Sequence, residues 1–341
     1  METDRQAEAE YREEAERLKL LPRETQRDLV EMYRRKAKFP KLSKQEKASA
    51  REKANALARL LHMATYSLKF TGTCGRAEFD ARCAEHDFWY HSFYFDNGFV
   101  QHGDYDIGRD IEGYGLPSDL SGMSVLDVGT GSGWFATYFE QLGADVTTVD
   151  VRGFCDMDVF TRPGYPDIST ERNGPDRVSQ DGRAIYYSAV SKGFWIMKEL
   201  LGLRAEYVNA RIYDLHPSLF NGKRFDLVFL GAVLMHLRDP IGALMAAHSV
   251  CKHQVIANSL KSAQEENSSR ALMELMADLH DDQLAWWMPN KLCLQAWFRG
   301  AGFRSVSVNR TINLTIDEPH YGEYGCTGAG NQTLYLAEAF V

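Results

Sequence analysis

The stretch SVLDVGTGSGWFATYF, residues 124–139, constrains the fold more than any other part of the sequence. An apolar run containing Asp127 leads into three glycines, Gly129, Gly131 and Gly133, after which a helical pattern begins. Glycines at such a point let the backbone turn sharply and let a ligand approach it closely. The stretch therefore predicts a buried strand, a ligand-binding turn and a helix in succession.

The sequence after Met123 continues this alternation of strand and helix patterns. We expect strands at 124–129, 145–151, 205–215, 224–234, 253–260, 305–316 and 330–340, and helices at 134–143, 193–202, 240–251 and 295–303. Such alternation is typical of an α/β fold in which a mostly parallel sheet carries helices on both faces. Ligands of these folds bind at the carboxyl ends of the strands.

Three regions differ in composition, and we expect them to be distinct parts of the protein. Residues 1–70 read as a charged, helical N-terminal cap, which we expect to cover the acceptor site or to form a homodimer contact. Residues 71–118 form an aromatic-rich approach segment, and residues 119–341 form the main domain. The main domain carries an insertion at about 152–192 that is rich in Gly, Pro, Asp and Arg in its first part.

Composition limits the functions that the chain can have. The net charge of −8 argues against general nucleic-acid binding, although residues 31–60 hold ten Lys or Arg against three Glu. That basic segment reads either as a solvated helical face or as a polyanion-binding patch. No apolar run is long enough to span a membrane, and the six cysteines form no C-x-x-C pair, so we expect a cytoplasmic protein without membrane contact.

The residues around the glycine turn exclude two other nucleotide-binding motifs. No Gly-Lys-Ser/Thr follows, which excludes the phosphate-binding P-loop. A dinucleotide motif that starts at Gly129 needs glycine at Trp134, and one that starts at Gly131 needs glycine at Ala136. Bulky tryptophan does not suit the close approach of a pyrophosphate.

The segment VLDVGTGSGWFATYFEQLGADVTTVDV instead resembles the first two motifs of the class I S-adenosylmethionine-dependent methyltransferases. The resemblance implies a Rossmann-like, seven-stranded fold with S-adenosyl-L-methionine as cofactor. It places Asp150 on the ribose hydroxyls, Asp127 at the amino-acid end of the cofactor and Leu230 beside the methyl group. It further implies cofactor contacts from Gly129, Thr130, Gly131, Gly133, Val151, Gly231, from Tyr213 on the adenine ring, and from Asp214, expected at the end of the third strand.

A narrower resemblance comes from FLGAVLMHLRDPIGAL, the approach WYHSFYFDNGFVQHGDYD and the tail WMPNKLCLQAWFRGAGF. These segments look like the branch that contains the tRNA wobble-uridine carboxymethyltransferases. That branch carries a tyrosine at the position of Met235, where it helps to hold the carboxylate of an unusual cofactor. A thioether cannot do so, which favours ordinary methyl transfer. Arg109 falls where the branch places a basic residue on the cofactor side, although a surface ion pair explains it equally well.

Candidate catalytic and substrate residues cluster in two segments. His236, just beyond the fourth strand, and His91 in the approach are candidate bases because imidazole titrates near neutrality, although His236 equally fits a role in holding its loop. Aromatic walls suit a planar or cationic acceptor. For these walls we expect Tyr90, Tyr94, His102, Tyr105, Trp286, Trp287 and, as a polar partner, Asn290, while the tryptophans also fit lid packing. The spacing of these residues predicts no metal site.

Three functions are compatible with the sequence. The leading hypothesis is a methyltransferase that acts on oxygen or nitrogen of a small-molecule acceptor. The second is a tRNA-modifying methyl- or carboxymethyltransferase that uses the basic residues 31–60. The third is a cofactor-binding protein without catalysis.

Overall fold

The computed structural model describes residues 67–86, 89–153, 156–159, 191–262, 268–276, 285–315 and 332–341, with the pairs 177–178 and 184–185 and scattered positions before residue 67. Nearly all of the expected N-terminal cap, the basic segment and most of the expected insertion lie outside these residues. None of the helices in the described ranges is long and apolar enough to cross a membrane.

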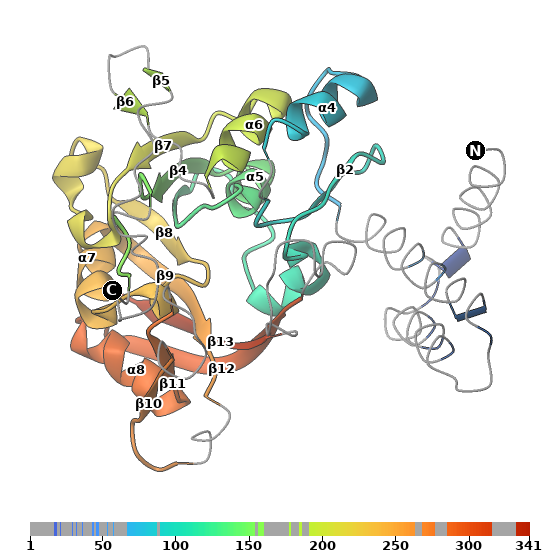
Figure 1. Cartoon of the computed structure of the whole chain (residues 1–341). Helices are drawn as coiled ribbons and strands as arrows, with labels where there is room; N and C mark the ends of the chain where they lie inside the picture. Colours follow the sequence, from blue (N-terminus) through green and yellow to red (C-terminus); the bar gives the residue numbers. More distant parts are fainter. Residues whose placement is uncertain are drawn as a thin grey trace.

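A single seven-stranded sheet forms the centre of the fold and confirms the predicted class (Figure 1). In spatial order its strands are β12 (Ser305–Leu314), β13 (Gln332–Phe340), β9 (Cys251–Leu260), β8 (Phe225–Leu230), β3 (Ser124–Val128), β4 (Asp145–Asp150) and β7 (Glu206–Asn209). Only β13 runs antiparallel to its neighbours among these seven strands. The ends of β3, β4, β7 and β8 therefore meet at one edge of the sheet, called here the carboxyl edge.

Helices cover both faces of the sheet, as the alternating pattern predicts. The helices α5 (Trp134–Gln141) and α6 (Lys192–Leu201) pack on one face, and α7 (Pro240–Val250) and α8 (Lys291–Gly300) pack on the other (Figure 1). Side chains of β3 and β8 alternate between two apolar clusters, one on each face. Burial of both faces explains why these strands read as nearly continuous apolar runs.

The approach segment is more ordered than its loop-like sequence indicates. It forms the helix α4 (Arg76–Cys83), the short antiparallel strands β1 (Phe93–Tyr94) and β2 (Val100–Gln101), and the 3-10 helix η1 (Ile107–Tyr114). Its buried phenylalanines Phe79, Phe93 and Phe95 belong to the cluster on the α5 and α6 face. The aromatic composition thus serves packing on the main domain as well as the site.

Two short strand pairs and a 3-10 helix were not expected from the sequence. Between β9 and α8, β10 (Met273–Leu275) pairs with β11 (Trp287–Pro289), and the pair β5 (Arg177–Val178) and β6 (Ala184–Ile185) lies in the insertion. The 3-10 helix η4 (Ile212–Asp214) replaces the second half of the predicted third strand. That strand, β7, ends at Asn209.

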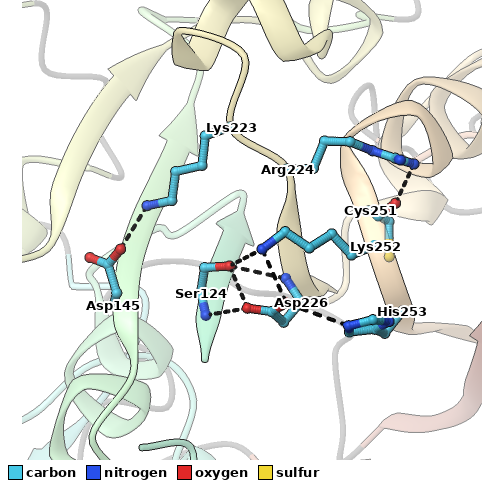
Figure 2. Close-up of polar contacts among 8 residues, drawn as sticks. All are labelled: Ser124, Asp145, Lys223, Arg224, Asp226, Cys251, Lys252 and His253. Carbon is cyan, nitrogen blue, oxygen red and sulfur yellow. Dashed lines mark hydrogen bonds and ion pairs between the residues drawn. The ribbon is translucent and has the colours of Figure 1, made fainter. Parts of the chain in front are cut away.

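A polar network joins three central strands at the amino edge, opposite the carboxyl edge (Figure 2). The carboxylate of Asp226 accepts hydrogen bonds from the backbone N–H and the hydroxyl of Ser124, at 2.8 Å and 2.7 Å. Its other oxygen lies 3.2 Å from Nζ of Lys252. These hydrogen bonds and the lysine hold the pKa of Asp226 down at about 2. The amino edge is therefore fixed by charge-assisted contacts.

Candidate cofactor and acceptor site

The glycine turn between β3 and α5 has a backbone that demands glycine. Gly129, Gly131 and Gly133 have φ values of 74°, 54° and 87°, in the left-handed region. A Cβ on Gly129 would lie 2.6 Å from Cγ2 of Val233, and one on Gly133 would lie 2.7 Å from Cδ2 of Phe194. The turn therefore holds its shape only with these glycines, as the sequence predicts.

Asp150 closes the turn from the end of β4. One carboxylate oxygen accepts the backbone N–H of Gly131 at 3.0 Å, and the other accepts that of Val151 at 2.8 Å. Burial raises the pKa of Asp150 to about 6 in spite of these two hydrogen bonds. The carboxylate is thus fixed at the glycine turn, with few protein donors to compensate its charge.

Asp127 is even less compensated. It is buried at the end of β3, and its Oδ2 has no hydrogen-bond partner among the described residues. Burial raises the pKa of Asp127 to about 7, the charge of Asp150 adds to the increase, and the neighbouring Thr130 opposes it. A buried carboxylate without compensating contacts destabilises the folded protein. Its presence here is explained by a ligand that supplies hydrogen-bond donors or positive charge.

The residues after β8 turn sharply beside the two acids. Leu230 ends the strand, as predicted, and a Cβ on Gly231 would lie 2.8 Å from Cε1 of Phe229. Ala232 has a φ of 54°, a conformation unusual for a residue with a side chain. Its N–H donates to the side-chain oxygen of Asn258 on β9. Backbone strain of this kind concentrates at functional sites.

The prediction that Asp214 lies at the end of the third strand is wrong. Asp214 lies in η4, five residues after the last residue of β7, and its side chain is exposed. The apolar Ile212 and Tyr213 extend the strand pattern in the sequence, but they belong to the 3-10 turn. Asn209 occupies the strand end instead, with its Nδ2 3.4 Å from the Asp150 carbonyl.

Asp158, which sequence reasoning missed, connects the segments around this edge. Its carboxylate accepts hydrogen bonds from Nη2 of Arg211 at 3.0 Å, from the Tyr213 hydroxyl and from the backbone N–H of Arg238 at 2.8 Å. Its carbonyl accepts the indole N–H of Trp286. A lone aspartate in a Gly- and Pro-rich stretch carries no pattern that would reveal contacts so far along the chain. These contacts connect the start of the insertion to three other loops.

The approach segment brings His91 beside the turn. The backbone N–H of Tyr90 donates to the hydroxyl of Ser132, within the glycine turn, at 2.9 Å. The ring of His91 lies 4.9 Å from that of Tyr90 and 6.3 Å from that of Phe135, and burial lowers its pKa to about 3. Tyr105 packs 5.0 Å from Tyr90. His91 is therefore a neutral imidazole at neutral pH.

The other predicted residues of the approach segment, Tyr94, His102 and Arg109, contact one another or neighbouring residues of the same segment. Tyr94 is buried in β1, and its ring is 5.8 Å from that of His102, which is half-buried. Arg109 pairs with the buried Asp106, with 3.5 Å between Nε and Oδ2. Arg109 thus has an acidic partner in the structure, as its interpretation as an ion-pair residue requires.

The tail residues have mainly structural contacts. Trp286 donates its backbone N–H to the Met235 carbonyl at 2.7 Å, and Trp287 donates its indole N–H to the Arg238 carbonyl at 3.1 Å. Asn290 caps α8, accepting from Cys293 N–H at 2.9 Å and donating to the Arg270 carbonyl. The amide of Asn290 therefore holds the chain, and its predicted role toward an acceptor has no geometric support. His236 is half-buried at the end of η6 (Leu234–His236).

These features fit the methionine-derived cofactor that the sequence implies. The glycine turn leaves backbone accessible at positions where a Cβ atom would clash. Asp150 presents a buried carboxylate, and the uncompensated carboxylate of Asp127 suits a cationic amino group. In the described ranges, no three His, Cys, Asp or Glu side chains gather to hold a metal ion. The two buried carboxylates and the glycine turn thus suit a polar cofactor that carries a positive charge.

The strand order and this site define a class I, Rossmann-like, S-adenosylmethionine-dependent methyltransferase domain. The chain belongs to the methyltransferase domain family, whose model matches residues 99–308.

Among known proteins, the chain is similar to tRNA U34 carboxymethyltransferases. It is 26% identical over 202 residues to that of Idiomarina loihiensis, covering 59% of this chain and 51% of the relative. It is 27% identical over 210 residues to that of Colwellia psychrerythraea, covering 61% and 52%. The matches thus span about half the length of these curated relatives. The N-terminal domain of EvdMO1, solved with S-adenosylhomocysteine bound, aligns with a TM-score of 0.47 and 15% identity over 79% of this chain and 98% of that chain.

Proposed function

We propose that this chain transfers a methyl group from S-adenosylmethionine to a small organic molecule. The observation that carries this proposal is that three arginines around the carboxyl edge each form an ion pair with an aspartate. The pairs are Arg109 with Asp106 at 3.5 Å, Arg152 with Asp156 at 2.6 Å, and Arg211 with Asp158 at 3.0 Å. A nucleic acid binds chiefly through cations available to its phosphates. Arginines already paired with acids favour an uncharged or small acceptor instead.

The surroundings of Met235 favour methyl over carboxymethyl transfer. Its side chain is 4% exposed and belongs to the apolar cluster on the α5 and α6 face. A second carboxylate on the cofactor would find no donor in this side chain. This supports ordinary S-adenosylmethionine as the methyl donor.

The chain's own residues act mainly by positioning. When bound, the cofactor supplies a methyl group on a positively charged sulfur. Asp150 and the glycine turn would hold its ribose, and Asp127 its amino group. Fixing donor and acceptor in line is the chief requirement of such a displacement. Burial lowers the pKa of His91 to about 3, which makes it a poor general base at neutral pH, so the structure does not support its predicted role as a base.

A tRNA substrate is the second candidate, favoured by the names of the relatives. Its binding would use the basic residues 31–60, so the affinity should fall steeply with salt concentration. Methylation of a small molecule should be nearly indifferent to salt.

The test is to incubate the full chain with methyl-labelled S-adenosylmethionine and a cell extract, and then to separate RNA, protein and low-mass fractions. We expect label in the low-mass fraction, and none with Asp150→Ala. Label in the RNA fraction, abolished by salt, would establish the second candidate. If calorimetry shows that the cofactor binds but no fraction carries label, the chain is a cofactor-binding protein without catalysis, which is the third hypothesis.

A further inference from the structure

Helix α7 carries apolar side chains on its outward side as well as toward the sheet. Residues Pro240–Val250 include no Asp, Glu, Lys or Arg. Leu244 and Ala247 are buried in the apolar cluster on the sheet, whereas Ile241 and Met245, one turn apart, are 38% and 55% exposed. A surface helix normally has polar residues on its solvent side, and a helix that is apolar all round is usually buried. The outward side of α7 therefore has the composition of a covered surface.

The neighbouring helix α8 extends this apolar surface. α7 and α8 pack against each other on one face of the sheet (Figure 1), so their exposed side chains point away from the sheet together. On α8, Leu292 and Ala296 are exposed one turn apart. A Cβ on Gly300 would lie 3.8 Å from Cγ2 of Ile241, so the two helices approach closely there. Exposed apolar side chains gathered in this way mark an interaction surface. We call Ile241, Met245, Leu292 and Ala296 the α7–α8 face.

Charges of opposite sign lie on the two sides of this face. Across the sheet, α8 packs on β12 and β13, and α7 packs on β8 and β9. The 3-10 helix η4 also contacts α7 but follows β7, at the other end of the sheet, so η4 and α8 lie on opposite sides of α7. Asp214 of η4 and Arg299 of α8 are exposed, and neither forms an ion pair with another described residue. The face thus has an acidic side and a basic side.

We propose that the α7–α8 face binds the same face of a second copy of this chain, around a twofold axis that runs along α7 between the two copies. Such an axis places the η4 side of each copy against the α8 side of the other. Asp214 of each copy then faces Arg299 of the second copy, and the apolar side chains meet between these charges. The inference goes beyond the proposed function and does not depend on it.

The charges favour a second copy over a lipid surface as the occupant of this face. A helix face that lies on a membrane is flanked by Lys and Arg, which attract anionic lipids. Here one side carries a carboxylate instead. Opposite charges on the two sides are what a surface needs in order to be complementary to itself.

Sedimentation equilibrium of the full chain over a range of protein concentrations tests the inference. We expect the wild type to associate to twice the mass of one chain. Met245→Glu places a carboxylate on the apolar face and should raise the dissociation constant about a hundredfold. Phe340→Glu is the matched control. Phe340 is 44% exposed at the end of β13, and its neighbour Ala339 packs in the cluster below α7 and α8, so Phe340 points to the other face of the sheet. This control should associate like the wild type.

Charge reversal tests the orientation of the two copies. Asp214→Arg and Arg299→Asp each set like charges opposite each other at two symmetric places, so each should weaken association about tenfold. The double variant exchanges the charges and should return the dissociation constant to within about threefold of wild type. The inference is overturned by a double variant that associates no better than the single ones. It is equally overturned by a wild type with the mass of one chain at every concentration, or by Met245→Glu that associates as tightly as wild type, because the contact then lies elsewhere.

Discussion

Replacing Asp127 by Asn should stabilise the ligand-free protein while it abolishes cofactor binding. The pKa of Asp127 rises from an ordinary 3.8 to about 7 because the carboxylate is buried without a partner for Oδ2. Since the folded pKa lies above the unfolded one, folding takes up a proton between pH 4 and 7, and stability falls as the pH rises through this window. A shift of about three pKa units corresponds to about 4 kcal/mol at pH 8.

The gain in the variant will be smaller because the new amide is also buried. We expect about half of this gain, or about 2 kcal/mol, which for a chain of this size raises the melting temperature by about 3 °C at pH 8. Thermal unfolding followed by tryptophan fluorescence measures this directly. The gain should shrink toward pH 5, where the wild-type carboxyl group is protonated in the folded state.

Asp226→Asn is the matched control at the other edge of the sheet. Its pKa is lowered to about 2, so its stabilisation is fully present above the unfolded value near 4 and is lost as the pH falls toward 2. That variant should melt lower than wild type at pH 8, by about 1 to 2 kcal/mol of stability. If Asp127→Asn also melts lower at pH 8, the argument from burial is refuted. Added cofactor should raise the melting temperature of wild type and Asp226→Asn but not that of Asp127→Asn.

Three further predictions concern the turn, the connected loops and His91. Gly129→Ala should lower stability by about 2 kcal/mol, because its Cβ would clash with Val233 at a left-handed φ, and urea unfolding measures this loss. Asp158→Ala should weaken cofactor binding about tenfold by releasing the loops around the site, whereas Asp80→Ala, which breaks an exposed pair with Arg76 on α4, should leave the calorimetric affinity unchanged. Because the pKa of His91 is about 3, methylation rates should show no ionisation of this residue between pH 5 and 8, and a limb near pH 6.5 that disappears in His91→Gln would contradict this.

The central fold was predictable because its signals are local. A strand, three glycines and a helix within sixteen residues determine the turn, and Asp150 follows at the end of the next strand. The positions of Leu230 and Gly231 follow in the same way. The strand and helix alternation predicted the seven strands, and the central strands β3 and β8 gave the clearest signal because they bury both faces.

The rest of the site depends on contacts that leave no local pattern. Asp214 was misplaced because Ile212 and Tyr213 look like strand residues although they form a 3-10 turn. Asp158 meets Tyr213 across 55 positions of the chain, and no periodicity records such a contact. Asn258 reads simply as part of a buried strand. For Asn290 a signal was present, since Asn directly before a helix is a common cap.

The position of β13 has a consequence for the order in which the protein is built on the ribosome. β13 follows the other six strands of this sheet in the chain, yet it lies inside the sheet, between β9 and β12. β12 has no other partner strand in the described sheet, so it stays unpaired until synthesis has passed Phe340. Until then the nascent chain exposes the edge of β9, a surface that invites aggregation. Chaperones that shield strand edges should therefore be most important until β13 has emerged from the ribosome.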